Sequence, residues 1–156
     1  MNMSLGGFLG RDQIIPALRA TNRWEAIDEL IANLITTGKL KPEHREAVTG
    51  AICKRERSMS TGIGKGIGLP HSASDRIDGV IGAFGRSQPG INFDALDEQP
   101  VHLVVLFLVP QGQVQKHLHA MADIARLLHK EDFRRALDQA PDADAILQII
   151  RSRQIS

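Results

Sequence analysis

Apolar residues recur at the spacing of a helix near the start of the chain. Within residues 22–37 they share one face, which predicts a helix there. The members of that face are Trp24, Ile27, Ile31, Leu34 and Ile35. Asn22 is suited to cap the first turn, with Glu25 three residues later as in a capping box, and Gly38 is suited to end the helix.

A second helix is predicted to begin near Pro42, because proline is favoured at the first helical position. Its inward-facing residues are Val48, Ala51 and Ile52, and its end carries the charged run of residues 54–57. A glycine-rich stretch follows, so we expect the helical part to stop before residue 61.

Two apolar stretches predict strands, at residues 80–84 and 101–109. The second is the stronger pattern, and Pro110 and Gly112 end it. The polar connection between them, residues 86–100, contains Pro89, Gly90 and Asp94. We expect a long loop there, of the kind that often borders a functional site.

Helical periodicity returns in the last third of the chain, over residues 114–129, 131–137 and 144–151. The apolar stripe of the first of these helices is Leu118, Met121, Ala122, Ala125 and Leu128. A helix pair, then strands, then three helices predicts a single layered domain of α and β structure rather than two domains.

Composition narrows the class of protein. The 156 residues are 42% hydrophobic and 24% charged, with a net charge of +1, which offers no electrostatic case for binding nucleic acid. The single cysteine, Cys53, excludes an internal disulfide and is better explained as a small buried residue than as a reactive thiol. The longest apolar run is far shorter than the roughly 20 residues that span a membrane, and residues 1–10 do not resemble a signal peptide. We therefore expect a cytoplasmic protein without stable membrane insertion.

The most informative local feature is the run of residues 61–71, where glycine occupies every second position from 62 to 68. Glycine permits unusual backbone angles and close approach of another molecule, so we expect a loop shaped to admit a ligand. Pro70 favours an extended conformation at Leu69, which places His71 at the end of a short extended segment. Imidazole can take up or pass on charge near neutral pH.

Two further histidines lie near the start of the predicted helix 114–129. His117 and His119 are about 200° apart on a helix, so they cannot easily share a ligand. His117 aligns with Met121 and Ile124 and is predicted to face the protein, whereas His119 is predicted to face solvent. A histidine on a glycine-rich loop and another at a helix start favour phosphate or phosphoryl chemistry.

Other assignments for these side chains are weaker but remain open from the residues alone. The chain lacks H-x-x-x-H and C-x-x-C spacings, which disfavours a metal site, and Gly66 does not precede a Lys-Ser or Lys-Thr pair, which disfavours a nucleotide-binding phosphate loop. The remaining histidines are explained by solvated or structural roles, and they are His44, His102 and His129.

Three separated segments resemble motifs of one protein family and occur in the same order along the chain as in that family. They are residues 61–71, residues 91–97 followed by Pro100, and residues 108–110 followed by His117. They resemble the fructose/mannitol-type enzyme IIA (EIIA type 2) domain, a phosphoryl carrier of the bacterial phosphoenolpyruvate-dependent phosphotransferase system (PTS). The similarity is greatest to the nitrogen-regulatory branch and covers about residues 22–151.

The resemblance implies roles for three residues. His71 matches the histidine that is phosphorylated, His117 matches a second histidine that hydrogen-bonds the phosphoryl group, and Arg55 matches an arginine that helps to hold it. Without the resemblance, Arg55 is better explained by a surface ion pair, for example with Glu56. No metal and no cofactor are implied. The implied fold is α+β, a single three-layer α/β/α domain over residues 1–156 with a mixed sheet flanked by helices and a core of about residues 15–152.

The implied function is that of a phosphotransferase component. His71 would accept phosphate from a phosphocarrier protein of the HPr or NPr type, with a regulatory role in nitrogen or potassium metabolism. The alternatives are an EIIA of a sugar uptake system that passes phosphate to EIIB, and a non-catalytic module that binds a regulatory target protein. Two positions depart from the family pattern: Gly68 stands where alanine is common, and Ser72 where glycine is common.

Some neighbouring residues have two explanations. Lys65 could attract phosphate or an acidic partner, or be a solvated lysine. Ile67 and Leu69 could belong to the core or to a docking surface. Asp94 could be an ordinary turn residue.

Overall fold

The computed structural model describes residues 7–153, apart from the side chains of residues 119 and 120. A six-stranded mixed sheet forms its middle layer, in the order β1-β5-β6-β3-β2, with β4 also paired to β6. The strands are β1 (Ile14–Ile15), β2 (Gly62–Gly64), β3 (Ile67–Gly68), β4 (His71–Ser74), β5 (Ile81–Ile91) and β6 (Val101–Pro110). The α-helices are α1 (Arg23–Thr36), α2 (Arg45–Ser58), α3 (Val114–Leu128), α4 (Glu131–Gln139) and α5 (Ala143–Ser152), and short 3-10 helices are η2 (Arg11–Gln13) and η3 (Pro42–His44).

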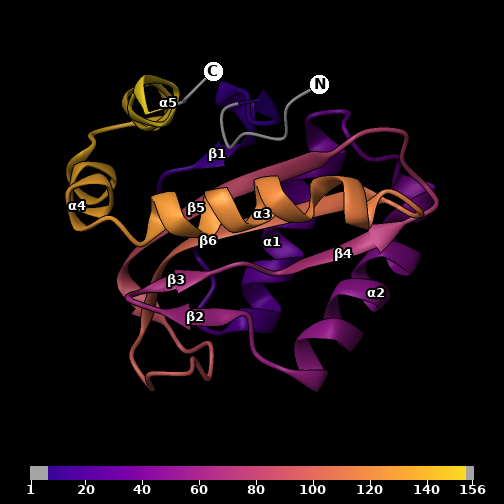
Figure 1. Ribbon diagram of the computed structural model, residues 1–156, viewed down its shortest axis with the longest axis horizontal. Helices are drawn as coiled ribbons and strands as arrows, with labels where there is room; N and C mark the ends of the chain where they lie inside the picture. The colour runs from indigo at the N-terminus through magenta and orange to yellow at the C-terminus, as the bar shows by residue number, and fades with distance from the viewer. Residues whose placement is uncertain (1–6, 154–156) are drawn as a thin grey trace.

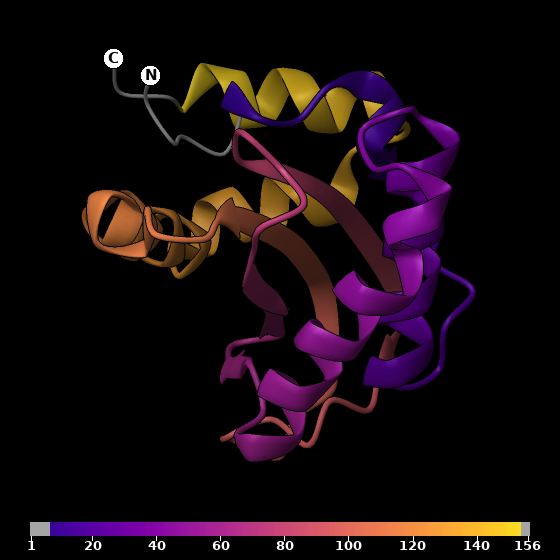
Figure 2. The same ribbon diagram turned by 90° about the vertical axis from the view of Figure 1, so that its right-hand side faces the viewer.

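Helices cover both faces of this sheet, which confirms the predicted three-layer α/β/α arrangement. Helices α1 and α2 lie on one side and α3 and α4 on the other, with the strands between them (Figures 1 and 2). Side chains of β6 alternate between the two cores: Val105 and Phe107 pack with residues of α3, and Val104 and Leu106 pack with residues of α1. The apolar run that predicted this strand is therefore a strand buried on both faces.

Strands β3 and β4 follow one another along the same side of β6. Ile67 pairs in parallel with Leu103, and His71 pairs in parallel with Phe107. Strand β2 covers only β3, so β4 forms the edge of the sheet beyond it, and α2 packs against β4. His71 therefore begins an edge strand of the sheet, against which α2 packs.

The start of α1 confirms most of the predicted capping. Asn22 caps the helix, with its Oδ1 accepting a hydrogen bond from Glu25 N at 3.0 Å. The Glu25 carboxylate does not close the capping box on Asn22, because it accepts from the Thr21 backbone and hydroxyl, both at 2.9 Å. Gly38, with φ +77°, follows the helix end as expected.

Trp24 does not belong to the buried face of α1, contrary to the prediction. Its side chain lies at the first turn, is 38% exposed, and has the guanidinium of Arg23 at 4.4 Å from its ring centroid and that of Arg57 at 6.0 Å. The indole therefore has cationic partners at the surface in place of core contacts.

The predicted loop over residues 86–100 is wrong in its first part, because β5 continues to residue 91. Arg86 and Ser87 are only 6% and 1% exposed. The Arg86 guanidinium donates to the carbonyls of Leu137 at 2.8 Å, Ala140 at 2.6 Å and Pro16 at 3.0 Å. Two polar residues are thus buried in a strand because distant backbone carbonyls and strand pairing satisfy them.

The apolar stripe predicted for α3 is also displaced. Leu118 is 48% exposed and Ala122 is exposed, whereas Ile124 and Leu128 are buried. His117 is only 8% exposed, which confirms the prediction that it faces the protein, and it lies on the inner side of the helix whereas Leu118 does not. In the part of the chain that the structure describes, none of the helices is long and apolar enough to cross a membrane.

Candidate functional site

The glycine run forms a β-hairpin in place of the predicted loop. Strands β2 and β3 pair antiparallel, and the turn between them is made by Gly64, Lys65 and Gly66, whose φ angles of +99°, +58° and +80° lie in the left-handed region. The exposed Lys65 is held in this strained turn by its backbone N–H, which donates to Asp97 Oδ2 at 3.0 Å.

The other two glycines of the run, Gly62 and Gly68, lie in close contact with another segment of the protein. A Cβ on Gly68 would lie 2.9 Å from the Phe93 ring, and a Cβ on Gly62 would lie 2.7 Å from Ala95 Cβ. The segment that follows β5 therefore packs directly onto the hairpin backbone. Ile67, at 0% exposure, belongs to the core rather than to a docking surface. These glycines serve close packing, which corrects the expectation that they admit a ligand.

His71 is held on two sides. Its Nδ1 lies 2.8 Å from the Leu69 carbonyl oxygen. Because a carbonyl only accepts, Nδ1 carries the proton in a neutral ring and Nε2 is left with its lone pair. One face of the ring stacks on Phe107, with centroids 5.0 Å apart and planes 6° apart. The nitrogen with the free electron pair is thus fixed in position by a strand carbonyl and a core aromatic ring.

Arg55 reaches this nitrogen from the last turns of α2. Its Nε donates to His71 Nε2 at 3.3 Å, while its side chain stays exposed. The predicted alternative, an ion pair between Arg55 and Glu56, does not form, since the Glu56 side chain is fully buried and binds Arg23. The structure therefore brings together two of the three residues singled out from the sequence.

Burial governs the protonation of His71. It lowers the pKa of the imidazole from its ordinary value of 6.5, and the positive charge of Arg55 acts in the same direction. The hydrogen bond to Leu69 and the negative charge of Glu56 oppose the lowering. The balance favours the neutral ring near pH 7, in which Nε2 can act as a nucleophile.

His117 lies on the same side of the sheet as the His71 ring. The ring stacks on Phe107, which belongs to the core cluster that also contains Ile124 of α3. The turn that leads into α3 is tied to the end of β4, where the Ser74 carbonyl accepts from Gln111 N at 2.8 Å (Figure 1). Among the described residues, no hydrogen bond joins His117 to His71. The side chain of His119 lies outside the described residues.

The other candidates have structural explanations. His102 Nδ1 lies 2.9 Å from the Ser87 carbonyl, and the exposed His129 caps the end of α3. His44 is half-buried rather than solvated. Burial raises the pKa of the half-buried Cys53 thiol, as suits an unreactive cysteine. Across residues 7–153, no group of three or more His, Cys, Asp or Glu side chains is placed to hold a metal ion.

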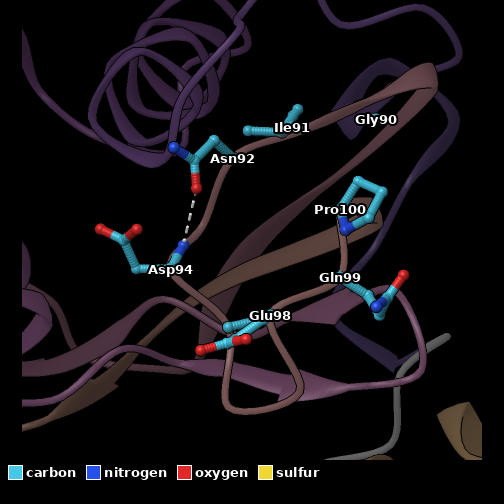
Figure 3. Close-up of a pocket in the computed structure, with 8 residues that line it drawn as sticks. Gly90, Ile91, Asn92, Asp94, Glu98, Gln99 and Pro100 are labelled. Atoms are coloured by element: carbon cyan, nitrogen blue, oxygen red, sulfur yellow. Dashed lines mark hydrogen bonds between the residues drawn. The ribbon is translucent and has the colours of Figure 1, made fainter.

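A separate hollow of about 460 Å³ lies beside the connection between β5 and β6 (Figure 3). Asn92, Asp94, Glu98 and Gln99 are among the residues that line it. Asp94 adopts φ +49° and donates its backbone N–H to Asn92 Oδ1 at 3.1 Å, so it is a turn residue, and its carboxylate lies 3.5 Å from Arg23. The hollow has none of His71, Arg55 or His117 in its lining, and it adds nothing to their chemistry.

Sequence reasoning missed two residues of the site. Phe107 was predicted only as part of a strand, because the partner of its ring depends on parallel pairing between distant segments. Glu56 lies in a charged run that suggested solvent exposure. A signal was present, since Val48, Ile52 and Glu56 follow one another at i, i+4 spacing on the buried face of α2.

Comparison with known proteins gives consistent matches. The model of the family described as "Phosphoenolpyruvate-dependent sugar phosphotransferase system, EIIA 2" matches residues 7–153. A "PTS system fructose-specific EIIABC component" of Bacillus subtilis is 36% identical over 148 residues, which are 95% of this chain and 23% of that protein. A "Nitrogen regulatory protein" of Bradyrhizobium diazoefficiens is 33% identical over 148 residues, 95% of each chain. The crystal structure of nitrogen regulatory protein IIA-Ntr from Neisseria meningitidis superposes with a TM-score of 0.84 at 25% identity, over 94% of this chain and 98% of that one.

Proposed function

This chain belongs to the EIIA type 2 family of the phosphoenolpyruvate-dependent sugar phosphotransferase system, and we propose that it carries a phosphoryl group on Nε2 of His71. The observation that supports this assignment most is the state of the His71 ring. Its Nδ1 donates to the Leu69 carbonyl at 2.8 Å, and its unprotonated Nε2 accepts a hydrogen bond from Arg55 Nε at 3.3 Å.

The chemistry follows from this tautomer. The Nε2 lone pair forms a bond to the phosphorus of a phosphohistidine donor, the donor's N–P bond breaks, and its electron pair stays with the donor imidazole. The His71 ring gains positive charge while its Nδ1–H stays bonded to the Leu69 carbonyl, so the hydrogen bond of 2.8 Å becomes charge-assisted. No proton has to leave His71 for the transfer to proceed.

Arg55 has to exchange partners during the reaction. Its Nε–H bond to Nε2 is given up when the lone pair becomes the N–P bond, and the guanidinium then binds phosphoryl oxygens. Phosphoryl transfer passes through a loose transition state, so positioning and charge balance are the main contributions of the protein. His117, on the same side of the sheet and 8% exposed, is the second group proposed to bind those oxygens.

The donor is proposed to be a phosphocarrier protein of the HPr or NPr type. A protein donor must come within reach of His71 and needs apolar surface to dock. Helix α3 exposes Val114 by 39% and Leu118 by 48%, on either side of His117 in the sequence. These two side chains are proposed contacts for the donor, which accounts for apolar residues that the core does not use.

A regulatory role is proposed ahead of sugar uptake. It is supported by the relatives named nitrogen regulatory protein, one of which is matched over 95% of its own length. The fructose-specific relative supports the alternative, in which His71 passes phosphate to EIIB. In the regulatory case, the phosphoryl group adds up to about two negative charges beside Arg55 and would switch the docking surface for a target protein.

The test is phosphorylation by phosphoenolpyruvate, enzyme I and an HPr- or NPr-type carrier, followed by intact mass and acid lability. We expect one acid-labile phosphate that His71→Ala abolishes without loss of the fold. His129→Ala is the matched control, because His129 is exposed and distant in the sequence from both proposed histidines. Normal labelling of the His71 variant would refute the assignment. No labelling of the unaltered protein by any matched carrier would favour the binding module.

A further inference from the structure

One fully buried carboxylate lies beside the site, and apart from the effect of its charge on the pKa of His71 it has no part in the proposed transfer. The Glu56 side chain has 0% exposure. Its Oε1 accepts from the Thr61 hydroxyl at 2.6 Å, and its Oε2 accepts from Thr61 N at 2.8 Å and from the Arg23 guanidinium at 3.2 Å. A buried carboxylate is costly unless it is paired and hydrogen-bonded, and these three donors satisfy it.

Glu56 joins three segments at one point. It lies in the last turn of α2, Thr61 directly precedes β2, and Arg23 is the first residue of α1. The hairpin that begins after Thr61 leads to His71. The carboxylate therefore ties the end of α2 to the start of the segment that carries the proposed phosphorylated histidine.

Arg55 is the neighbour of Glu56 in that last turn. Because adjacent helical residues point about 100° apart, fixing Glu56 inward sets the direction in which Arg55 leaves the helix. That direction brings Arg55 Nε to 3.3 Å from His71 Nε2.

The ion pair between Arg23 and Glu56 also affects the charge of Arg55. Arg23 binds Glu56 at 3.2 Å and Asp94 at 3.5 Å, so Glu56 is engaged away from Arg55. Among the described residues, the recorded side-chain hydrogen bond of Arg55 is the one to His71. The Arg55 charge thus remains available for a phosphoryl group.

We propose that Glu56 is a positioning residue for phosphoryl transfer, which directs Arg55 onto His71 by clamping the end of α2 to Thr61 and Arg23. The inference rests on the proposed function of His71. It differs from a purely stabilising role because it requires Glu56 to act through Arg55.

The first test compares Glu56→Met with Glu56→Gln. Methionine keeps the volume but accepts none of the three hydrogen bonds, whereas glutamine keeps an acceptor for Thr61 N and Arg23, and its amide can donate to the Thr61 hydroxyl. We expect phosphoryl acceptance to fall about 10- to 100-fold in Glu56→Met and to stay within about threefold in Glu56→Gln. Glu46→Met is the matched control, because Glu46 is exposed on the first turn of the same helix. Equal losses of phosphoryl acceptance in the two Glu56 variants would overturn the proposed positioning role of Glu56.

The second test is a double-mutant cycle with Arg55→Gln. If Glu56 acts through Arg55, adding Glu56→Met to Arg55→Gln lowers the rate by less than about twofold further. Fully multiplied losses would show that Glu56 acts independently of Arg55, and would overturn the inference.

Thr61 supplies a milder pair of variants in case Glu56→Met does not fold. Thr61→Val removes the hydroxyl that donates at 2.6 Å, and Thr61→Ser keeps it. We expect slower acceptance in the valine variant and near-normal acceptance in the serine variant. Equal rates in the two variants would overturn the inference.

A readout without phosphate separates this inference from the proposed function. The ¹⁵N signals of Arg55 Nε and His71 Nε2 report their hydrogen bond, and we expect both to shift in Glu56→Met but not in Glu46→Met. Unshifted signals would refute the positioning role even if the unaltered protein is phosphorylated. A protein that is never phosphorylated refutes the proposed function, while the shifts still decide whether Glu56 places Arg55.

Discussion

Gly68→Ala is the substitution that best separates close packing from ligand binding in the glycine run. Gly68 lies in β3, three residues before His71, and a Cβ there would lie 2.9, 3.0 and 3.3 Å from three carbons of the Phe93 ring. Phe93 has 0% exposure, so the ring cannot turn into solvent to make room. The substitution therefore compresses the contact between the hairpin and the segment after β5.

Two opposing contributions set the magnitude. Replacing glycine by alanine inside a strand gains about 0.5–1 kcal/mol, because glycine loses more backbone entropy on folding. Overpacking a filled core costs about 1–3 kcal/mol. The difference between the middle values is a net loss of about 1 kcal/mol in the free energy of unfolding, which is the loss we expect. Gly62→Ala should lose more, because its Cβ would lie 2.9 Å from Ala95 Cα, a backbone atom that no rotamer change can move.

The assay is equilibrium unfolding in urea, followed by phosphorylation at a temperature where both proteins are folded. We expect the midpoint to fall with little change in slope, and the rate of acceptance by His71 to stay within about twofold. Phe93→Leu in the Gly68→Ala protein should recover about 1 kcal/mol relative to the sum of the two single changes, since the smaller side chain makes room for the new methyl group.

Two results would refute this reasoning. Unchanged stability of Gly68→Ala, with no coupling to Phe93→Leu, would show that the ring is no barrier to a side chain at position 68. Lost phosphorylation at unchanged stability would show that Gly68 is needed for a ligand, as the sequence alone suggested.

Four further predictions concern the His71 ring, His117 and Arg86. Because burial lowers the pKa of His71 below 6.5, the rate of phosphate acceptance should persist below pH 6.5 and fall only as the pH drops through the pKa of His71 in the folded protein. A rate that halves above pH 6.5 would contradict this prediction. The same shift makes the contribution of His71 to stability complete above pH 6.5 and lost as pH falls through the folded pKa, which urea unfolding at a series of pH values can measure. His117→Ala should give a folded protein whose transfer is about 10²-fold slower, and unchanged kinetics would leave His117 a structural residue. Arg86→Met should lower the free energy of unfolding by about 3–5 kcal/mol, because two buried carbonyls lose charge-assisted donors, and Arg86→Lys by less; a loss below about 1 kcal/mol would contradict the role drawn from its contacts.

The helices could be predicted from sequence because their signals are local. Helix α1 has its apolar face, its Asn22 cap and Gly38 within one short segment, and α3 begins at Val114 as predicted. Which residues of a helix are buried was harder to predict, because it depends on how the helix is rotated against the sheet. Trp24 and Leu118 are exposed for that reason, although periodicity placed both on apolar faces.

Burial of polar side chains could not be predicted from local pattern. Arg86 is buried because carbonyls from the end of α4 and from residue 16 surround its guanidinium. Glu56 is buried because Thr61 and Arg23 supply its donors. In each case the compensating groups lie elsewhere in the chain, and a single charged residue carries no local sign of them.

In the candidate site, too, features with a local sequence signal could be predicted, and features that depend on distant segments could not. His71 could be singled out because glycines and a proline precede it. Two of those glycines, Gly62 and Gly68, pack against Ala95 and Phe93, and the other two form the hairpin turn. Its tautomer could not be predicted, and the approach of Arg55 was implied only by the family resemblance, because both depend on the break at residues 69 and 70 between β3 and β4.

The contrast between the two arginines near α2 fits the demands on a phosphoryl carrier. Arg23 is 15% exposed and locked to a fully buried Glu56, so it is suited to hold a shape. Arg55 is exposed, and its contact with a phosphoryl group would be screened by water. A carrier that bound its phosphoryl group too tightly would accept phosphate and then fail to release it, because strong ground-state binding raises the barrier for onward transfer. In the proposed mechanism, an exposed arginine that is oriented by a buried ion pair would meet both needs. Its direction would come from the buried contacts of Glu56, and its binding of the phosphoryl group, screened by water, would remain reversible.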